Sequence, residues 1–260
     1  MVEETLIAIS RTLRILTVGD GDFSASLALI KAYNPHYLVA TTLLSSESEL
    51  LKVYPHAQQI LLDLQSYDES CTIMYGVDAT QLHHHSKLMH QKFDLILFQH
   101  PHLGYNSSTA LNDTDSSKTH TELHCQLLAH YLYSAQSLLC NDNPNACVHL
   151  CLCGESYLKW KLTESVERLG LEFHSVGSAS KCLLSCYLNS NGNHGRIHHQ
   201  KMRRKGHWLG RYGYRHCPTF PSDTTFDTNI SASIHYFMKR KKSVDNLSET
   251  HLHRMSSTLD

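Results

Sequence analysis

Short apolar runs recur along the first 152 residues of the chain and predict the strands of a sheet. Each run is four to eight residues long and is bounded by glycine, proline or polar residues, which is typical of buried strands. The runs are residues 14–18, 37–44, 72–75, 93–98 and 146–152.

The segments between these runs carry apolar residues at helical spacing. They are residues 23–32, 47–65, 122–139 and 157–169, and Pro55 predicts a break in the second. Residues 171–176 and 181–188 are expected to close the sheet as strands. Strands that alternate with helices predict an α/β fold with a mainly parallel sheet and helices on both of its faces.

The same pattern divides the chain into one domain with extensions. We expect an N-terminal extension over 1–12, a domain over 13–218 with a basic insertion near 189–211, and a polar, flexible tail over 219–260. Residues 104–118 are rich in Ser, Thr, Asn and Asp and predict a mobile loop. No apolar run approaches the ~20 residues of a membrane helix, and the acidic start argues against a secretory signal. We therefore expect no membrane partner.

Charge is distributed unevenly along the chain. Residues 1–172 hold 10 Lys/Arg and 19 Asp/Glu, whereas residues 173–260 hold 13 and 5. This asymmetry suggests one face for an anionic partner such as nucleic acid, although a solvated basic loop is the alternative. The expected phosphate contacts are Lys201, Arg203, Arg204, Lys205 and Arg211, with Trp208 and Tyr212 available for stacking on bases. The basic run 239–242 is either a nuclear localisation signal or part of a solvated tail.

The nine cysteines have no disulfide-framework spacing and include no CxxC pair, so we expect free thiols. Histidine is unusually frequent, with 21 copies. Its spacings follow no metal-binding pattern, so we expect no metal site, and metal binding through the histidines is the alternative.

The turn after the first predicted strand contains the first candidate chemistry. It consists of Gly19, Asp20, Gly21, Asp22, Phe23 and Ser24. Glycines allow a tight turn and a close approach of backbone to ligand. No third glycine and no P-loop lysine follow, and two acids would repel a pyrophosphate. The turn suits a cationic ligand without phosphate, such as S-adenosylmethionine; the alternative is a tight turn with an exposed acidic pair.

Two further strand ends carry polar candidates. Asp78 follows the third strand, where it is able to accept a hydrogen bond from an adenine amino group or to cap a helix. Gln99, Pro101 and His102 follow the fourth strand. A polar residue and a proline at this place are typical of several methyltransferases that act on nitrogen, and an ordinary strand exit is the alternative.

Taken together, these segments resemble the eukaryotic large-subunit (25S-type) rRNA uridine-N3 methyltransferase family, whose Rossmann-like domain also occurs in ferredoxin-fold anticodon-binding domain-containing proteins. The resemblance covers roughly residues 13–217 and includes 16–24, 75–82, 93–104 and 213–216. It implies a class I S-adenosylmethionine-dependent methyltransferase fold and methylation of N3 of a uridine in large-subunit rRNA. It also implies a location in the nucleus, nucleolus or cytoplasm, and we expect a monomer.

The resemblance assigns roles to residues of both candidate regions. The implied cofactor residues are Gly19, Asp20, Gly21, Asp22, Phe23, Ser24, Asp78 and Ala79. The implied substrate residues are Gln99, Pro101 and His102, and His102 or His100 is a candidate acceptor of the N3 proton.

Some positions depart from the family pattern. Leu44 stands where the family has an acidic residue, Gln99 replaces an asparagine, and His124-Cys125 replaces an Asn-Arg pair. These differences leave two alternatives open: a catalytically weakened member that binds RNA or protein, and a methyltransferase that acts on a different substrate, such as another RNA or a protein.

Overall fold

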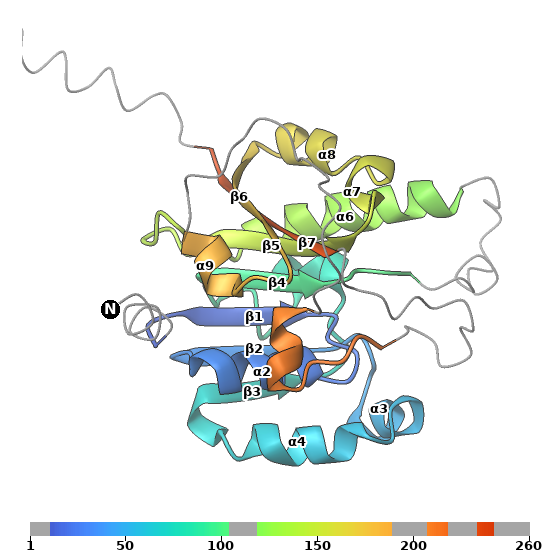
Figure 1. Ribbon diagram of the computed structural model, residues 1–260, viewed down its shortest axis with the longest axis vertical. Helices are drawn as coiled ribbons and strands as arrows, with labels where there is room; N and C mark the ends of the chain where they lie inside the picture. Colours follow the sequence, from blue (N-terminus) through green and yellow to red (C-terminus); the bar gives the residue numbers. More distant parts are fainter. Residues whose placement is uncertain (1–10, 104–118, 189–206, 218–232, 242–260) are drawn as a thin grey trace, which may run out of the picture.

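The chain folds around one mixed β-sheet. The computed structural model describes residues 11–103, 119–188, 207–217 and 233–241. Within these residues the sheet has seven strands in the order β3-β2-β1-β4-β5-β7-β6 (Figure 1).

The first five strands are parallel, and all were predicted from the apolar runs. They are β1 (Arg14–Val18), β2 (Tyr37–Thr41), β3 (Cys71–Met74), β4 (Leu95–Gln99) and β5 (Cys147–Cys153). β1 lies in the middle and pairs with β2 on one side and β4 on the other. The carboxyl ends of these strands therefore meet at one edge of the sheet, which is where open α/β sheets bind ligands.

The last two strands are antiparallel to their neighbours and close the sheet. β6 (Leu171–Ser178) is the predicted sixth strand, and β7 (Ser233–Arg240) lies between β5 and β6. The prediction of a flexible tail over 219–260 is therefore wrong for Ser233–Arg240. This segment was missed because its apolar residues alternate with His235 and end in basic residues, so no continuous apolar run marks it.

Helices cover both faces, as predicted. They are α2 (Ser24–Tyr33), α3 (Glu47–Val53), α4 (Ala57–Gln65), α6 (His120–Gln136), α7 (Ser156–Lys159), α8 (Leu162–Arg168) and α9 (Leu183–Leu188). Short 3₁₀ turns are η1 (Asp68–Ser70), η2 (Ala79–His84) and η3 (Trp208–Tyr212). The break at Pro55 is confirmed because α3 ends before it and α4 begins after it.

Two segments differ from their predicted form. The helix expected over 157–169 is split into α7 and α8, because Lys161 takes a left-handed conformation with φ 51°. Residues 181–188 were expected to form a strand, but they contain α9. A hydrogen bond connects α9 to β6, because Ser175 Oγ donates to the Cys186 carbonyl at 2.6 Å. β7 occupies the sheet position that this segment was expected to fill.

The two faces of the sheet form separate apolar cores. One core packs α6, α8 and η2 against the sheet, and the other packs α2, α4, α9 and η3 against the opposite face. Helices on both sides of this strand order, with an antiparallel β7, confirm the class I methyltransferase fold. No helix in the described part of the chain is long and apolar enough to cross a membrane.

Candidate functional site

The turn after β1 is built so that only glycine fits at its first position. Gly19 has φ +61°, and a Cβ placed there would lie 2.5 Å from Cε2 of Phe98 on the neighbouring strand β4. At Gly21 the same atom would come within 3.0 Å of the Tyr54 hydroxyl. Both glycines therefore let the backbone pass close to aromatic side chains.

Asp20 points back into the protein and caps the start of α2. Its Oδ2 accepts bonds from the Ser26 amide at 2.7 Å and from Ser26 Oγ at 2.6 Å. The carboxyl group is buried, and burial together with nearby Asp22 raises the pKa of Asp20 to about 7. Asp20 thus stabilises the turn by connecting it to the first residues of α2.

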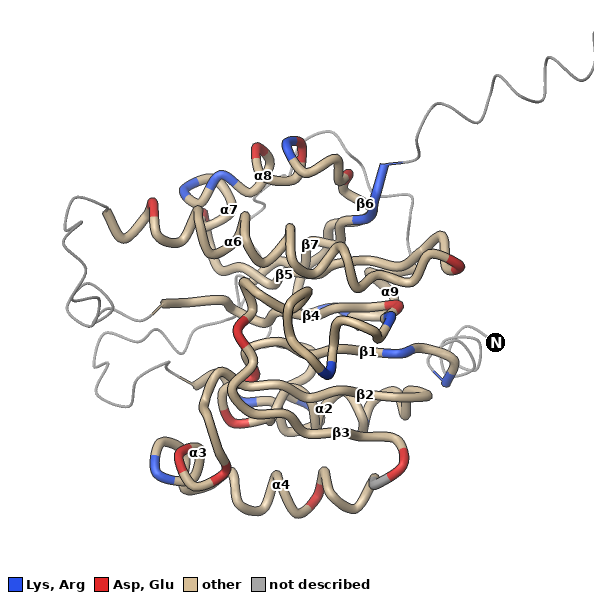
Figure 2. Tube along the Cα trace, turned by 180° about the vertical axis from the view of Figure 1, so that it is seen from behind, with Lys and Arg blue, Asp and Glu red and all other residues tan. Residues whose placement is uncertain are grey.

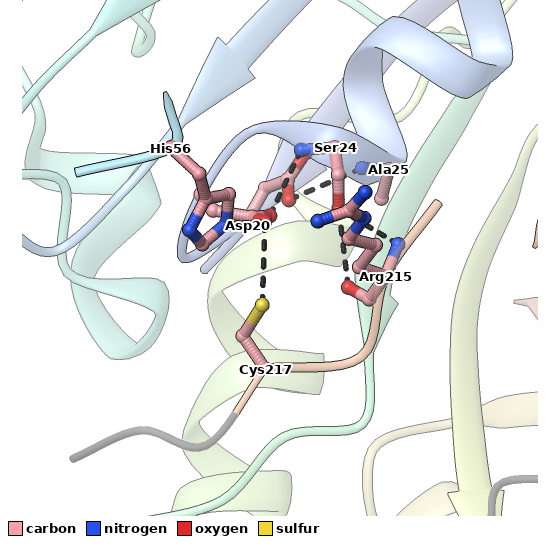
Figure 3. Close-up of polar contacts among 7 residues, drawn as sticks. Asp20, Ser24, Ala25, His56, Arg215 and Cys217 are labelled. Carbon is pink, nitrogen blue, oxygen red and sulfur yellow. Dashed lines mark hydrogen bonds and ion pairs between the residues drawn. The ribbon is translucent and has the colours of Figure 1, made fainter. Parts of the chain in front are cut away.

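Asp22 connects the turn to two distant segments of the chain. Figure 3 shows His56 and Cys217, which come from these segments, beside the turn. One carboxylate oxygen accepts the Ser24 amide at 3.0 Å. The other lies 2.9 Å from His56 Nε2 and accepts the Cys217 thiol at 3.3 Å. Both acids of the turn are buried, so the alternative of an exposed acidic pair is wrong.

The segment after η3 closes over this turn. Ser24 Oγ bonds to both the amide and the carbonyl of Arg215, each at 3.1 Å. The segment 213–216 was singled out in the sequence only as a matching motif; the structure shows that it connects the loop after β1 with the exit of β4. Its partners are almost two hundred residues away, so no local signal predicted this contact.

The ends of β2 and β3 form the next part of the edge. Asp78 is exposed, and its carboxylate accepts the Thr80 amide at 2.8 Å and the Thr80 hydroxyl at 2.7 Å. This capping contact was the alternative prediction for Asp78, and it leaves the carboxylate at the surface. Ala79 is buried behind it. Leu44 packs partly buried against the apolar core, so no carboxylate stands at that position.

Gln99, the last residue of β4, carries a buried amide with no hydrogen-bond partner in the described part of the chain. Neither Oε1 nor Nε2 is exposed to solvent or bonded to protein. A buried amide left without a partner costs about 1–3 kcal/mol, which a bound ligand is able to recover. Pro101 is buried two residues further on.

His100 is held inside a polar cluster and does not suit the role of base. Its backbone has φ 49°, and its ring nitrogens lie 3.0 Å from Tyr214 Oη and 2.9 Å from Ser233 Oγ. Burial and the neighbouring His216 lower the pKa of His100 well below its usual value. Both nitrogens are committed to protein hydroxyls, so the structure does not support His100 as the proton acceptor.

His102 lies beside two histidines from the first turns of α6. The ring centres of His102 and His124 are 4.8 Å apart, and those of His102 and His120 are 5.4 Å apart. In the sequence, His124 stood out only as a departure from the family pattern, and the spacing of the three histidines did not predict that they lie together.

Most of the expected RNA contacts lie outside the described residues: Lys201, Arg203, Arg204 and Lys205. Arg211 is exposed on η3. Trp208 stacks on Tyr33 with ring centres 5.3 Å apart, so one of its faces is occupied. Within the described part, basic and acidic residues both occur on α3 and on α8 (Figure 2).

The basic run 239–242 begins inside the sheet. Lys239 pairs with Glu172 on β6 at 3.6 Å, and the Arg240 guanidinium donates to Asn141. The alternative of a solvated tail is therefore wrong for these two residues. All nine cysteines are free thiols, as predicted.

The glycine turn fits S-adenosylmethionine better than a nucleotide with phosphates. Two glycines let its backbone run at the ligand-binding edge close to Phe98 and Tyr54, where a Cβ would be crowded. The turn carries two acidic residues and no basic one, which disfavours the negative phosphates of a nucleotide. The buried Gln99 amide adds a neutral polar group at the adjacent strand end.

Comparison with curated proteins gives partial matches. The chain is 30% identical over 156 residues to heavy metal-associated isoprenylated plant protein 41 of Arabidopsis thaliana, covering 60% of this chain and 28% of that protein. It is 30% identical over 140 residues to ferredoxin-fold anticodon-binding domain-containing protein 1 of Homo sapiens, covering 54% and 20%. An uncharacterised Arabidopsis thaliana protein is 29% identical over 67% of this chain and 75% of its own length. The chain thus spans less than a third of two of these relatives.

Solved structures with a similar arrangement include two bacterial methyltransferases. The ribosomal protein L11 methylase of Lactobacillus delbrueckii has a TM-score of 0.43 at 11% identity, covering 93% of this chain and 79% of that one. An O-methyltransferase of Brevibacillus brevis in complex with S-adenosyl-L-homocysteine has a TM-score of 0.44 at 12% identity, covering 96% and 74%.

The family match covers most of the described sheet. The model of the BMT5-like family, described as rRNA (uridine-N3-)-methyltransferase, matches residues 16–190, which include β1 to β6 and the turn after β1. The chain therefore belongs to the BMT5-like methyltransferase family, and its cofactor is S-adenosylmethionine.

Proposed function

We propose that this chain transfers a methyl group from S-adenosylmethionine to N3 of a uridine in large-subunit rRNA. The observation that carries the proposal is the buried, unpartnered amide of Gln99 at the carboxyl end of β4. β4 is the direct neighbour of β1, whose end forms the glycine turn, and Phe98 pairs with Val18. Gln99 therefore follows the residue that pairs with the end of β1, and a methyl acceptor would lie beside its amide.

The cofactor would lie along the edge formed by β1, β2 and β3. Gly19, Asp20, Gly21, Asp22, Phe23 and Ser24 would hold its amino-acid part, mainly through the backbone, because the acidic side chains of Asp20 and Asp22 point inward. Asp78 and Ala79 would contact the adenine, since the Asp78 carboxylate is exposed at the surface. The bound cofactor supplies an electrophilic methyl group.

The Gln99 amide matches the edge of a uracil. Uracil presents two carbonyl oxygens on either side of N3, and negative charge spreads onto these oxygens when N3 loses its proton. An amide N–H that donates to one of them would stabilise this charge. Pro101 would fix the loop, and His102 is our candidate for the acceptor of the N3 proton, because an unperturbed imidazole titrates near pH ~6.5.

The test is a Gln99→Leu variant, in which the side chain keeps its size and loses only its polar atoms. Because the amide has no partner, we expect the folded protein to keep its thermal stability, whereas 3-methyluridine formation falls by about a hundredfold. Gln58→Leu on the exposed surface of α4 is the matched control. Nucleoside mass spectrometry of rRNA from cells lacking the protein, complemented with each variant, measures the product.

Two results would contradict the proposal. Full 3-methyluridine in cells that lack the protein would exclude large-subunit rRNA as the substrate. Full activity of Gln99→Leu would remove the amide from the substrate site.

Leu44 favours a second candidate, a member of the family that binds RNA or protein without methyl transfer. A carboxylate at this strand end would hold the ribose hydroxyls of the cofactor, and the half-buried leucine has no group that does so. Titration calorimetry with S-adenosylmethionine separates the two functions. Saturable binding favours the enzyme, and the absence of heat at cofactor concentrations near 1 mM would leave only the binding module.

RNA phosphates would be held by Lys201, Arg203, Arg204, Lys205 and Arg211. This proposal rests on the excess of basic residues after residue 173. Five phosphate contacts to a single strand give a slope of about −3.5 for log affinity against log salt. A flat salt dependence of RNA binding would reject these contacts. The same RNA substrate places the protein where rRNA is made or used, in the nucleolus or the cytoplasm.

A further inference from the structure

The three histidines beside the exit of β4 form a cluster whose members come from both sides of one chain segment. His102 precedes residues 104–118, whereas His120 and His124 follow them on the first two turns of α6. One nitrogen of each ring lies within 4.8 Å of a nitrogen of both others. The i, i+4 spacing of His120 and His124 places both rings on one face of the helix.

The hydrogen bonds of His124 fix which nitrogen carries the proton. Its Nδ1 lies 2.8 Å from the His120 carbonyl oxygen, which only accepts hydrogen bonds, so Nδ1 is the protonated nitrogen. Nε2 therefore holds a lone pair. It accepts the Leu103 amide at 3.3 Å, so a metal ion at this nitrogen would take the place of that hydrogen bond.

This arrangement is the one that metal-binding histidines adopt. A ligating imidazole usually donates its other N–H to a carbonyl, a carboxylate or water, which fixes its orientation. The His120 carbonyl provides that partner, and Trp160 supports the ring of His124 by stacking at 4.3 Å between centres. His124 is thus oriented before any metal arrives.

A second cluster in the molecule shows the opposite pattern. Cys151, His207 and His235 also bring ligand atoms within 4.8 Å of one another. However, the Leu209 amide donates to Nδ1 of His207 at 3.2 Å, so the neutral ring carries its hydrogen on Nε2, the nitrogen 3.9 Å from the Cys151 sulfur. His207 therefore presents a hydrogen to that cluster rather than a lone pair.

We propose that His102, His120 and His124 bind one zinc ion, with a fourth position open to water. Three imidazoles and one open position are the ligand set of an accessible zinc site. Tetrahedral Zn–N bonds of about 2.0–2.1 Å place the nitrogens ~3.3 Å apart, so the cluster has to close by at most about 1.5 Å. The metal would join the two ends of residues 104–118 beside the exit of β4.

The site competes with the role of His102 as a base. A nitrogen lone pair that binds zinc is unable to accept the uridine proton at the same time. The zinc proposal does not rest on methyl transfer, and its test uses the metal alone.

The experiment is titration of the full-length protein with Zn²⁺, followed by calorimetry and by the melting temperature. We expect wild type to bind one equivalent in a tight step that raises the melting temperature. His102→Gln and His120→Gln should each weaken that step at least tenfold while the metal-free proteins melt like wild type. His84→Ala, which removes an exposed histidine of the 83–85 run, should bind Zn²⁺ like wild type.

Cobalt adds an independent measurement of the ligand geometry. Co²⁺ in place of Zn²⁺ should give the strong visible absorption of a four-coordinate site, and His120→Gln should lose it. The proposal is overturned if His102→Gln and His120→Gln bind Zn²⁺ as tightly as wild type, because the metal then resides on other histidines. It is also overturned if wild type shows no tight step of one equivalent of Zn²⁺.

Discussion

The parallel and antiparallel parts of the sheet are equally well buried but are built from different side chains. In the parallel part, buried positions such as Ile15, Leu16, Leu38 and Ile96 are aliphatic. In the antiparallel part, where β5 meets β7, the face toward α9 holds buried imidazoles and thiols: His149, Cys151 and His235. The strands of the first part are stabilised mainly by apolar burial, whereas the second part also depends on the protonation of its histidines.

Removal of β7 should have the largest effect on the stability of the domain. A chain that stops after residue 232 loses four buried side chains, Ile234, Tyr236, Phe237 and Met238, each worth about 1.5–3 kcal/mol. It also leaves the facing edges of β5 and β6 unpaired. Because domains are stable by only about 5–15 kcal/mol, we expect this chain to be unfolded by circular dichroism.

The matched control is a chain that stops after Lys241 and keeps all of β7. It should melt cooperatively. If the shorter chain also melted cooperatively at the same temperature, β7 would be dispensable and the parallel part would form the domain by itself.

The sequence revealed the parallel part because each strand there is a continuous apolar run with a local boundary. Leu16 and Ile96, for example, lie in runs that end at a glycine and before a proline. β7 has no such run, since His235 interrupts it, and its partners on β5 lie more than eighty residues earlier. α9 was misassigned because a short apolar stretch fits a strand or a helix, and the position of β7 decides between them.

The candidate site likewise contains features that the sequence predicted and features that it did not. The glycine turn and the placement of Gln99 were predictable, because both depend on residues next to a strand end. The partners of Asp22 were not, since His56 and Cys217 are 34 and 195 residues away. The meeting of His102 with α6 likewise depends on tertiary packing, which residue spacing does not encode.

The antiparallel part should lose stability at low pH because it contains the buried His149–His235 pair. Their rings contact each other at 2.9 Å, and burial lowers the pKa of both well below the usual value. In the unfolded chain they gain protons below pH ~6.5, whereas in the folded chain they stay neutral, so stability falls as pH drops. Two such groups contribute about 4 kcal/mol between pH 7 and pH 5.

We therefore expect the double variant His149→Leu/His235→Leu to be less sensitive to acid. Between pH 7 and pH 5 its free energy of unfolding, measured in urea, should fall by about 4 kcal/mol less than that of wild type. His100 and His207, which face the pair, keep the remaining acid sensitivity. An unchanged pH profile would show that the pair is protonated in the folded protein. Replacement of both rings avoids leaving one of them without its partner.

The parallel part should respond most strongly to a side chain at Gly19. Gly19→Ala places a Cβ 2.5 Å from Phe98 in a buried site, and we expect a loss of about 3 kcal/mol, at the upper end of overpacking costs. Gly170, between α8 and β6, has a similar φ of +67° but open space around it. Gly170→Ala therefore carries only the backbone strain, and equal losses for the two variants would disprove the steric contact. Calorimetry should also show that Gly19→Ala no longer binds S-adenosylmethionine.

Asp20 gives the parallel part a pH dependence of the opposite sign. Its folded-state pKa of about 7 exceeds the ordinary value of 3.8 for an aspartate, so the folded protein holds a proton that the unfolded chain has lost. The contribution of Asp20 is complete below the lower pKa and decreases as pH rises toward 7. Between about pH 5.5 and pH 7 the loss amounts to about 2 kcal/mol. Asp20→Asn should remove this decrease, because its amide oxygen is able to keep the two bonds from Ser26. A variant profile parallel to that of wild type would place the Asp20 pKa near 4.

The smallest expected losses of stability concern two basic residues at the end of β7, one in an ion pair and the other in hydrogen bonds. Lys239 and Glu172 form a partly exposed ion pair at 3.6 Å, so Lys239→Ala should cost less than about 1 kcal/mol and the loss should vanish in 1 M salt. Arg240 instead donates to Asn141 and to the carbonyls of Gln136 and Leu139, which tie β7 to the end of α6. Arg240→Ala should therefore cost more than Lys239→Ala and keep its effect in salt. If both losses disappeared with salt, β7 would be attached to α6 by charge alone, and the hydrogen bonds at its end would contribute nothing to the antiparallel part.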